Sequence, residues 1–173
     1  MMILSQDYYD KSVLSLRTGG EVGIAIAPII NPNTLKIEGW YAQARGEKVE
    51  YILPATEIRD VIGKGLVVDD HSALTPTEDM VRLKDVVALR FDLLDKQVST
   101  ESGRKLGKVG DFAVDNQSNY IKKLYVNPSL LRGLTSGQML IDRSHIIEIT
   151  NSKIIVSDAT IRDRAGAPAR AAA

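Results

Sequence analysis

The chain has 173 residues, and its 22 Lys and Arg side chains balance 22 Asp and Glu side chains. This balance excludes a global electrostatic field that would attract DNA or an anionic membrane. The absence of Cys excludes disulfides, thiolate catalysis and thiolate metal sites. No apolar run is long enough to span a bilayer, and residues 1–10 carry no signal-peptide pattern, so we expect a cytoplasmic protein with no membrane span.

The first part of the chain reads as a series of short strands. Apolar and β-branched residues alternate with small or polar ones, and Gly, Asn and Pro turns separate the runs. We expect strands at residues 12–16, 22–30, 36–42, 49–53 and 66–68. Pro28 cannot donate to a sheet ladder, so the strand that contains it is predicted to be an edge or to carry a bulge there. Residues 54–62 are predicted to form one 3₁₀ or helical turn that plugs a barrel end, because Ile58 and Val61 lie three residues apart.

A capping pattern in the middle of the chain predicts a helix over about residues 76–88. Thr75 occupies the N-cap, Pro76 the first helical position, and Glu78 follows the cap by three residues. Apolar residues at helical spacing would form its buried stripe: Met80, Leu83 and Val87.

Residues 103–126 read as a β-hairpin with a polar turn at 115–119. The same pattern occurs 84 residues earlier without a gap, so Gly103, Gly107, Ile121 and Tyr125 correspond to Gly19, Gly23, Ile37 and Tyr41. The arm that follows repeats with an offset of 88, which places a four-residue insertion in the second copy, within 127–138. Since a repeated unit usually has its own core, we predict two domains, each a small closed barrel.

The second copy resembles the PRC-barrel domain. The residues that carry the resemblance are Gly103, Leu106, Gly107, Lys108, Val109, Asp111, Ile121, Leu124 and Val126, and the first copy matches more weakly. The family includes the barrel of the photosynthetic reaction centre H subunit and the C-terminal domain of a small-subunit ribosome maturation factor. The resemblance implies a mainly β protein with two tandem small PRC-like β-barrels and a short connecting α-helix. Its domains would be residues 1–74, a helical linker at 75–92, a second barrel at 93–160 and a disordered tail at 161–173.

Nothing in the sequence indicates catalysis. Only two histidines, His71 and His145, are present, and no paired general acid and base or zinc ligand set can be assembled around them. The run from Gly103 to Lys108 superficially resembles a phosphate-binding loop, but three residues separate its glycines where four are needed. We therefore expect no enzyme, no catalytic residue, no metal and no cofactor.

We expect a non-catalytic adaptor or scaffold that binds a partner protein through its barrels. In PRC-barrel proteins the barrel serves as a docking module, which is what the resemblance implies here. An RNA-processing or ribosome-assembly accessory factor, with RNA or the ribosome as partner, is the alternative; a homodimer is compatible with either. The candidate partner site joins the insertion to the basic second hairpin: Leu130, Leu131 and Arg132 with Lys122 and Lys123. Leucines with an arginine suit an interface, although the leucines would equally cap a barrel end.

Overall fold

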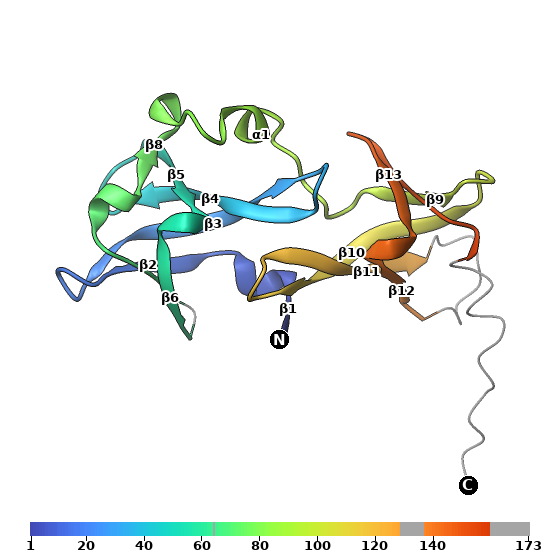
Figure 1. The fold of residues 1–173 in the computed structure, drawn as a ribbon, viewed down its shortest axis with the longest axis horizontal. Helices are drawn as coiled ribbons and strands as arrows, with labels where there is room; N and C mark the ends of the chain where they lie inside the picture. The colour runs from blue at the N-terminus through green and yellow to red at the C-terminus, as the bar shows by residue number, and fades with distance from the viewer. Residues whose placement is uncertain (64, 129–136, 160–173) are drawn as a thin grey trace, which may run out of the picture. The chain divides into compact units, whose positions relative to one another are not determined.

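The computed structural model describes residues 1–63, 65–128 and 137–159. Contacts divide them into two compact units. Unit 1 is Met1–Asp92 with Ala113–Ile121, and unit 2 is Leu93–Phe112 with the described residues from Lys122 onward. Each unit is mainly β (Figure 1). Within the described residues, no helix combines the length and the apolar character that crossing a membrane requires.

The described residues of unit 1 form eight strands, four 3₁₀ turns and one short α-helix, besides the part of the β10–β11 hairpin that belongs to this unit. Its elements are β1 (Met2–Leu4), η1 (Ser5–Tyr8), β2 (Lys11–Ser15), β3 (Glu21–Asn31), β4 (Lys36–Ala44), β5 (Glu50–Pro54), η2 (Ala55–Glu57), β6 (Ile58–Ile62), β7 (Gly65–Val68), η3 (His71–Ala73), β8 (Thr75–Pro76), η4 (Thr77–Asp79) and α1 (Lys84–Ala88). The strands follow the order β6-β7-β2-β3-β4-β5-β8. All neighbours are antiparallel except β2 and β7, which run parallel with Val13 opposite Leu66.

The strands from β9 to β14 follow a corresponding order. The elements are β9 (Gln97–Thr100), β10 (Lys105–Asp115), β11 (Tyr120–Pro128), β12 (Met139–Asp142), η5 (Arg143–His145), β13 (Ile146–Ile149) and β14 (Lys153–Val156). Their order is β13-β14-β9-β10-β11-β12. Here β9 and β14 form the parallel pair, with Val98 opposite Ile154. The 3₁₀ turn η5 precedes β13 just as η2 precedes β6.

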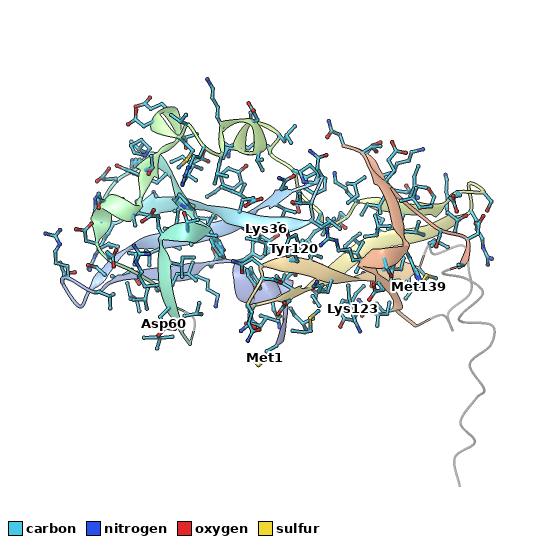
Figure 2. The ribbon with its side chains drawn as sticks, viewed as in Figure 1. Met1, Lys36, Asp60, Tyr120, Lys123 and Met139 are labelled. Atoms are coloured by element: carbon cyan, nitrogen blue, oxygen red, sulfur yellow. The ribbon has the colours of Figure 1, made fainter. Side chains whose placement is uncertain are left out.

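The hairpin of β10 and β11 contributes its tip to unit 1. Ile3 of β1 pairs with Val114 of β10, and Lys36 of β4 pairs with Tyr120 of β11. The Lys36 ammonium lies 5.9 Å from the centre of the Tyr120 ring, and both side chains are labelled in Figure 2. The tip therefore supplies both strand pairing and a cation–π contact to unit 1.

Closed barrels were predicted, but the described strands form an open sheet. Both β6 and β13 pair on one side only, with β7 and β14. In unit 1 the outer edge of β5 pairs with β8, where Ile52 lies opposite Thr75. Since β8 occupies that edge, β6 cannot pair there to close the sheet.

The predicted helix over 76–88 is largely wrong, because α1 spans only Lys84–Ala88. Thr75 and Pro76 form β8, and Thr77 begins a 3₁₀ turn. The Thr77 hydroxyl donates to the carbonyl oxygen of Glu50 at 3.1 Å, so pairing with β5 replaces the predicted capping box. The burial predicted for these positions is confirmed, since Met80 and Val87 are core residues with Leu83 packed against them, but Met80 and Leu83 lie outside α1.

The predicted plug turn is shorter than expected. Its 3₁₀ turn covers Ala55–Glu57, and Ile58 and Val61 lie on strand β6 instead. The bulge predicted around Pro28 is confirmed. The register of β3 against β4 shifts between Ala25 and Ala27 and again between Ile29 and Ile30.

Candidate functional site

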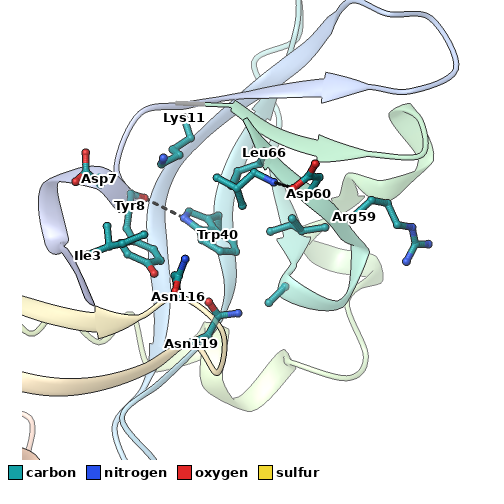
Figure 3. Close-up of a pocket in the computed structure, with 13 residues that line it drawn as sticks. Ile3, Asp7, Tyr8, Lys11, Trp40, Arg59, Asp60, Leu66, Asn116 and Asn119 are labelled. Carbon is teal, nitrogen blue, oxygen red and sulfur yellow. Dashed lines mark hydrogen bonds between the residues drawn. The ribbon is translucent and has the colours of Figure 1, made fainter. Parts of the chain in front are cut away.

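A cavity of about 390 Å³ lies in unit 1 and is shown in Figure 3. Segments that are distant in sequence line it: β1 and η1 with the start of β2, strand β4, η2 with strand β6, strand β7, and the β10–β11 turn. Its main polar and aromatic side chains are Tyr8, Lys11, Trp40, Asp60, Asn116 and Asn119.

Trp40 forms a buried aromatic wall of this cavity. The side chain is 2% exposed and stacks on Tyr8, with ring centres 6.1 Å apart and planes 3° from parallel. Its indole N–H donates to the backbone carbonyl of Tyr8 at 2.9 Å. That bond satisfies the one polar group of the indole and fixes the orientation of the ring.

Lys11 brings a positive charge into the cavity wall. Residues of β2 alternate between buried and half-buried, and this period of two puts Lys11 on the same face as Val13 and Ser15. Lys11 is only 7% exposed, and its ammonium donates to the carbonyl oxygen of Gly63 at a long 3.5 Å. Lysine is seldom buried to this extent, because a buried ammonium must be paired or hydrogen-bonded.

The phenol of Tyr8 stays protonated at neutral pH. Burial, together with the negative charges of Asp115 and Asp7, raises the pKa of Tyr8 to about 12. The hydroxyl therefore remains able to donate a hydrogen bond throughout the physiological range.

Arg59 of β6, which lines the cavity, forms an ion pair with Asp69. The Arg59 guanidinium donates to the Asp69 carboxylate at 2.6 and 3.0 Å, and this bond lowers the pKa of the Asp69 carboxyl. The neighbouring Asp60 carboxylate accepts from the backbone N–H of Val61 at 2.8 Å. The side chains of Arg59 and Asp60 both line the cavity, and both are exposed.

The β10–β11 turn carries two carboxamides. Asn119 has a positive φ of 58°, which asparagine tolerates better than most residues. The turn is held by the Asp115 carboxylate, which accepts from the Ser118 hydroxyl at 2.7 Å. In Figure 3 the side chains of Asn116 and Asn119 rise from the turn toward the rings of Tyr8 and Trp40.

In unit 2, the backbones of two neighbouring strands come close together. Gly107 of β10 and Asn127 of β11 approach so closely that a side chain at Gly107 would overlap the Asn127 carbonyl oxygen. On the facing pair, Lys123 of β11 lies opposite Asp142 of β12. Hydrogen bonds from the Ser144 backbone N–H and hydroxyl lower the pKa of Asp142, and the charge of Lys123 lowers it further.

Comparison with known families assigns this part of the chain. Residues 86–162 match the family model of the PRC-barrel domain. The chain contains a PRC-barrel domain. The match covers α1 from Val86 onward and every strand from β9 to β14, and residues 1–85 lie outside it. No curated protein matches the chain.

The candidate partner residues all fall inside the PRC-barrel domain. Lys122 is exposed on β11, and Lys123 is half-buried beside Asp142, which offsets part of its charge. Leu130, Leu131 and Arg132 lie outside the described residues, so the predicted site stays a prediction. The structure thus places two of its five members, next to each other on one strand.

Sequence reasoning missed the cavity of unit 1. Lys11 occupies a strand position that the alternating pattern predicts to be buried. A lysine at a buried position is the sequence feature that could have indicated the cavity. The contribution of Asn116 and Asn119 carried no signal, because a polar turn is ordinary for a hairpin. Among the described residues, no group of three or more His, Asp or Glu side chains is arranged to hold a metal ion.

Proposed function

We propose that this protein is a non-catalytic adaptor that binds a partner protein through two PRC-type units in tandem. The common strand order of β2–β7 and β9–β14 supports a second, divergent copy of the domain in residues 1–74. Domain boundaries at 74, 92 and 160 and a cytoplasmic location belong to the same proposal. The PRC-barrel match to residues 86–162 supports the C-terminal of the two copies.

This proposal rests on the outer strands of the two copies, β6 and β13. Among the described strands, β6 pairs only with β7, and β13 pairs only with β14. Each exposes a large apolar side chain: Ile62 is 62% exposed and Ile147 is 53% exposed. An open strand edge with apolar side chains can accept an extended peptide as an added strand. We therefore propose an extended segment of the partner protein as the occupant.

The charges beside these apolar groups limit which segments fit. Arg59 and Asp60 flank the apolar end of β6, and Glu148 follows Ile147 on β13. Charged residues and the register shifts in both strands hinder indiscriminate edge pairing. A partner segment would need complementary charges at these positions.

The proposal is tested with edge variants. The tagged protein and an Ile62→Lys, Ile147→Lys double variant are used to recover partners from the native cell, and each recovered protein is then tested in purified form. We expect the double variant to lose a partner that binds the parent, because two charges replace the apolar contacts. A Leu16→Lys, Leu89→Lys variant changes charge equally at exposed leucines away from both edges and should retain binding. Equal binding by both variants would overturn the edge-docking proposal.

RNA binding remains the second candidate because residues 103–126 carry four exposed cations. They are Arg104, Lys105, Lys108 and Lys122. Binding to phosphates would weaken steeply with salt, whereas apolar edge docking would not. Titration of a labelled single-stranded RNA at low and physiological salt separates the two. Saturable RNA binding with a steep salt dependence, lost when the four cations are replaced by Gln, would favour the accessory-factor function.

A further inference from the structure

We infer that the cavity of unit 1 binds a small organic anion, with Lys11 at its anionic end. This inference does not depend on the adaptor function. A volume of about 390 Å³ lies within the range of small-molecule sites, roughly 300–1,000 Å³. The wall combines a buried cation with carboxamides and apolar side chains, which is the pattern of a site rather than of a surface dimple.

Lys11 supplies the charge that selects an anion. Its side chain lines the cavity although the residue is 7% exposed, so bulk water screens its charge little. A carboxylate or phosphate that reaches this ammonium gains a charge-assisted hydrogen bond, which is shorter and stronger than a neutral one. Carboxylate and phosphate share this chemistry, and the test below distinguishes them.

The turn supplies neutral donors on another side of the cavity. Asn116 and Asn119 each carry an NH₂ group with two donors. Tyr8 adds a phenol that keeps its proton because its pKa is raised to about 12. These groups can hydrogen-bond to an anion without adding charge, which orients the ligand relative to Lys11.

The remaining wall favours one anionic group on an apolar body. Ile3, Leu66 and Trp40 line the cavity and offer apolar contacts. Asp7 and Asp60 also line it, so their negative charges balance Lys11 and Arg59 and repel a polyanion. The attraction is therefore local to Lys11, and nucleic acid is a poor fit.

Trp40 makes the test direct because it is the single tryptophan of the chain. Its indole N–H gives one signal in an amide NMR spectrum, and the ring lines the cavity. The full chain is titrated with benzoate, phenyl phosphate and benzamide, which is the neutral counterpart of benzoate. We expect a saturable shift of the indole signal with at least one of the two anions, at least about tenfold tighter than with benzamide.

Two pairs of variants locate the anionic end. Lys11→Met removes the charge and should weaken the anion at least about tenfold, whereas Lys48→Met removes an exposed lysine outside the cavity and should not. Asn116→Asp adds a negative charge to the wall and should weaken the anion. Gln117→Glu adds the same charge at the next position of the turn, which does not line the cavity, and should have a smaller effect. If Lys11→Met does not fold, the Asn116 and Gln117 pair decides.

Each outcome of these titrations either supports or overturns the anion site. Tighter binding of benzoate or phenyl phosphate than of benzamide, weakened selectively by the cavity variants, supports the site and names its preferred head group. Equal shifts with benzamide, equal losses in matched controls, or no saturable shift with either anion would overturn it. The adaptor test changes Ile62 and Ile147, which do not line the cavity, so the two proposals fail independently.

Discussion

Gly107 lies where the backbones of β10 and β11 come close together. Its φ is +148°, which residues with side chains rarely adopt. A Cβ at this position would overlap the carbonyl oxygen of Asn127 and lie 3.1 Å from the Cα of Pro128. We predict that Gly107→Val lowers the free energy of unfolding of unit 2 by about 2–4 kcal/mol, since strand backbone must move.

Denaturant unfolding followed through amide signals of β9 to β14 measures this loss. Gly20→Val is the matched control, because a Cβ at Gly20 has no neighbour closer than 3.8 Å. Coincident midpoints for Gly107→Val and the parent would contradict the prediction.

Tyr8 links the cavity to stability at alkaline pH. Burial raises its pKa in the folded chain to about 12, whereas an unfolded tyrosine titrates near about 10. Between about pH 10 and about pH 12 the folded state keeps a proton that the unfolded state releases, so stability falls as pH rises. Below about pH 10 both states are protonated and the phenol adds no pH dependence.

We predict that Tyr8→Phe removes part of this alkaline loss, on the order of 2 kcal/mol. Urea midpoints of the parent and the variant, measured at about pH 7, 9 and 12, provide the test. The difference between the two proteins should be constant from pH 7 to 9 and change above about pH 10. A constant difference across the whole range would refute the prediction.

At the scale of elements, α1 shows how tertiary contacts hold a helix that is too short to stand alone. It has five residues, and isolated helices below about 12 residues are marginal in water. Val87 packs in a cluster with Ile29, Ile52 and Met80. The Tyr41 hydroxyl donates to the Val87 carbonyl at 3.1 Å, which satisfies a carbonyl at the end of the helix.

Arg90 fastens the chain just beyond α1. Its guanidinium lies 4.6 Å from the centre of the Tyr41 ring and donates to the Glu50 carboxylate at 2.8 Å. The hydrogen bond from Arg90 lowers the pKa of Glu50. Because the pair is partly exposed, its contribution to stability is small compared with that of the Val87 cluster.

We predict that Val87→Ala lowers the free energy of unfolding by about 1–2 kcal/mol, because it removes two buried methyl groups and leaves a small void. Val81→Ala makes the same chemical change at a side chain that is 85% exposed and should stay within about 0.5 kcal/mol of the parent. Thermal or urea denaturation compares them. Equal effects of the two substitutions would show that α1 is not held by this cluster.

At the scale of the whole molecule, unit 1 includes a segment from far along the chain. β1 pairs with β10 through Ile3 and Val114, and β4 pairs with β11 through Lys36 and Tyr120. A fragment of residues 1–92 has the strands β2 to β8 but lacks these partners.

We predict that the fragment 1–92 has a lower melting temperature than unit 1 of the full chain, and that β1 is unstructured in it. Chemical shifts of Met2–Leu4 should move to random-coil values, while signals of β2 and β3 stay dispersed. Strand-like shifts for β1 in the fragment would contradict the role of the 113–121 tip.

The sequence by itself determined most of the strands. The expected strands at 12–16, 22–30, 36–42, 49–53 and 66–68 correspond to β2, β3, β4, β5 and β7, and the hairpin corresponds to β10 and β11. Alternating apolar residues and glycine turns act within a few residues of each other, so these signals can be read from short stretches of the sequence. The resemblance to a PRC-barrel domain, carried by the same local pattern, is confirmed for residues 86–162.

The tertiary structure alone decided the open strand order, the extent of the helix and the cavity. Thr75 and Pro76 carry a helix-capping signal, but pairing with Tyr51 and Ile52 of β5 replaces it, because strand pairing and burial outweigh a cap that contributes about 1 kcal/mol. The cavity brings together Lys11 and Asn116, which are more than a hundred positions apart in the sequence. Contacts between residues this far apart depend on which strand edges pair. A local pattern of residues does not specify that pairing.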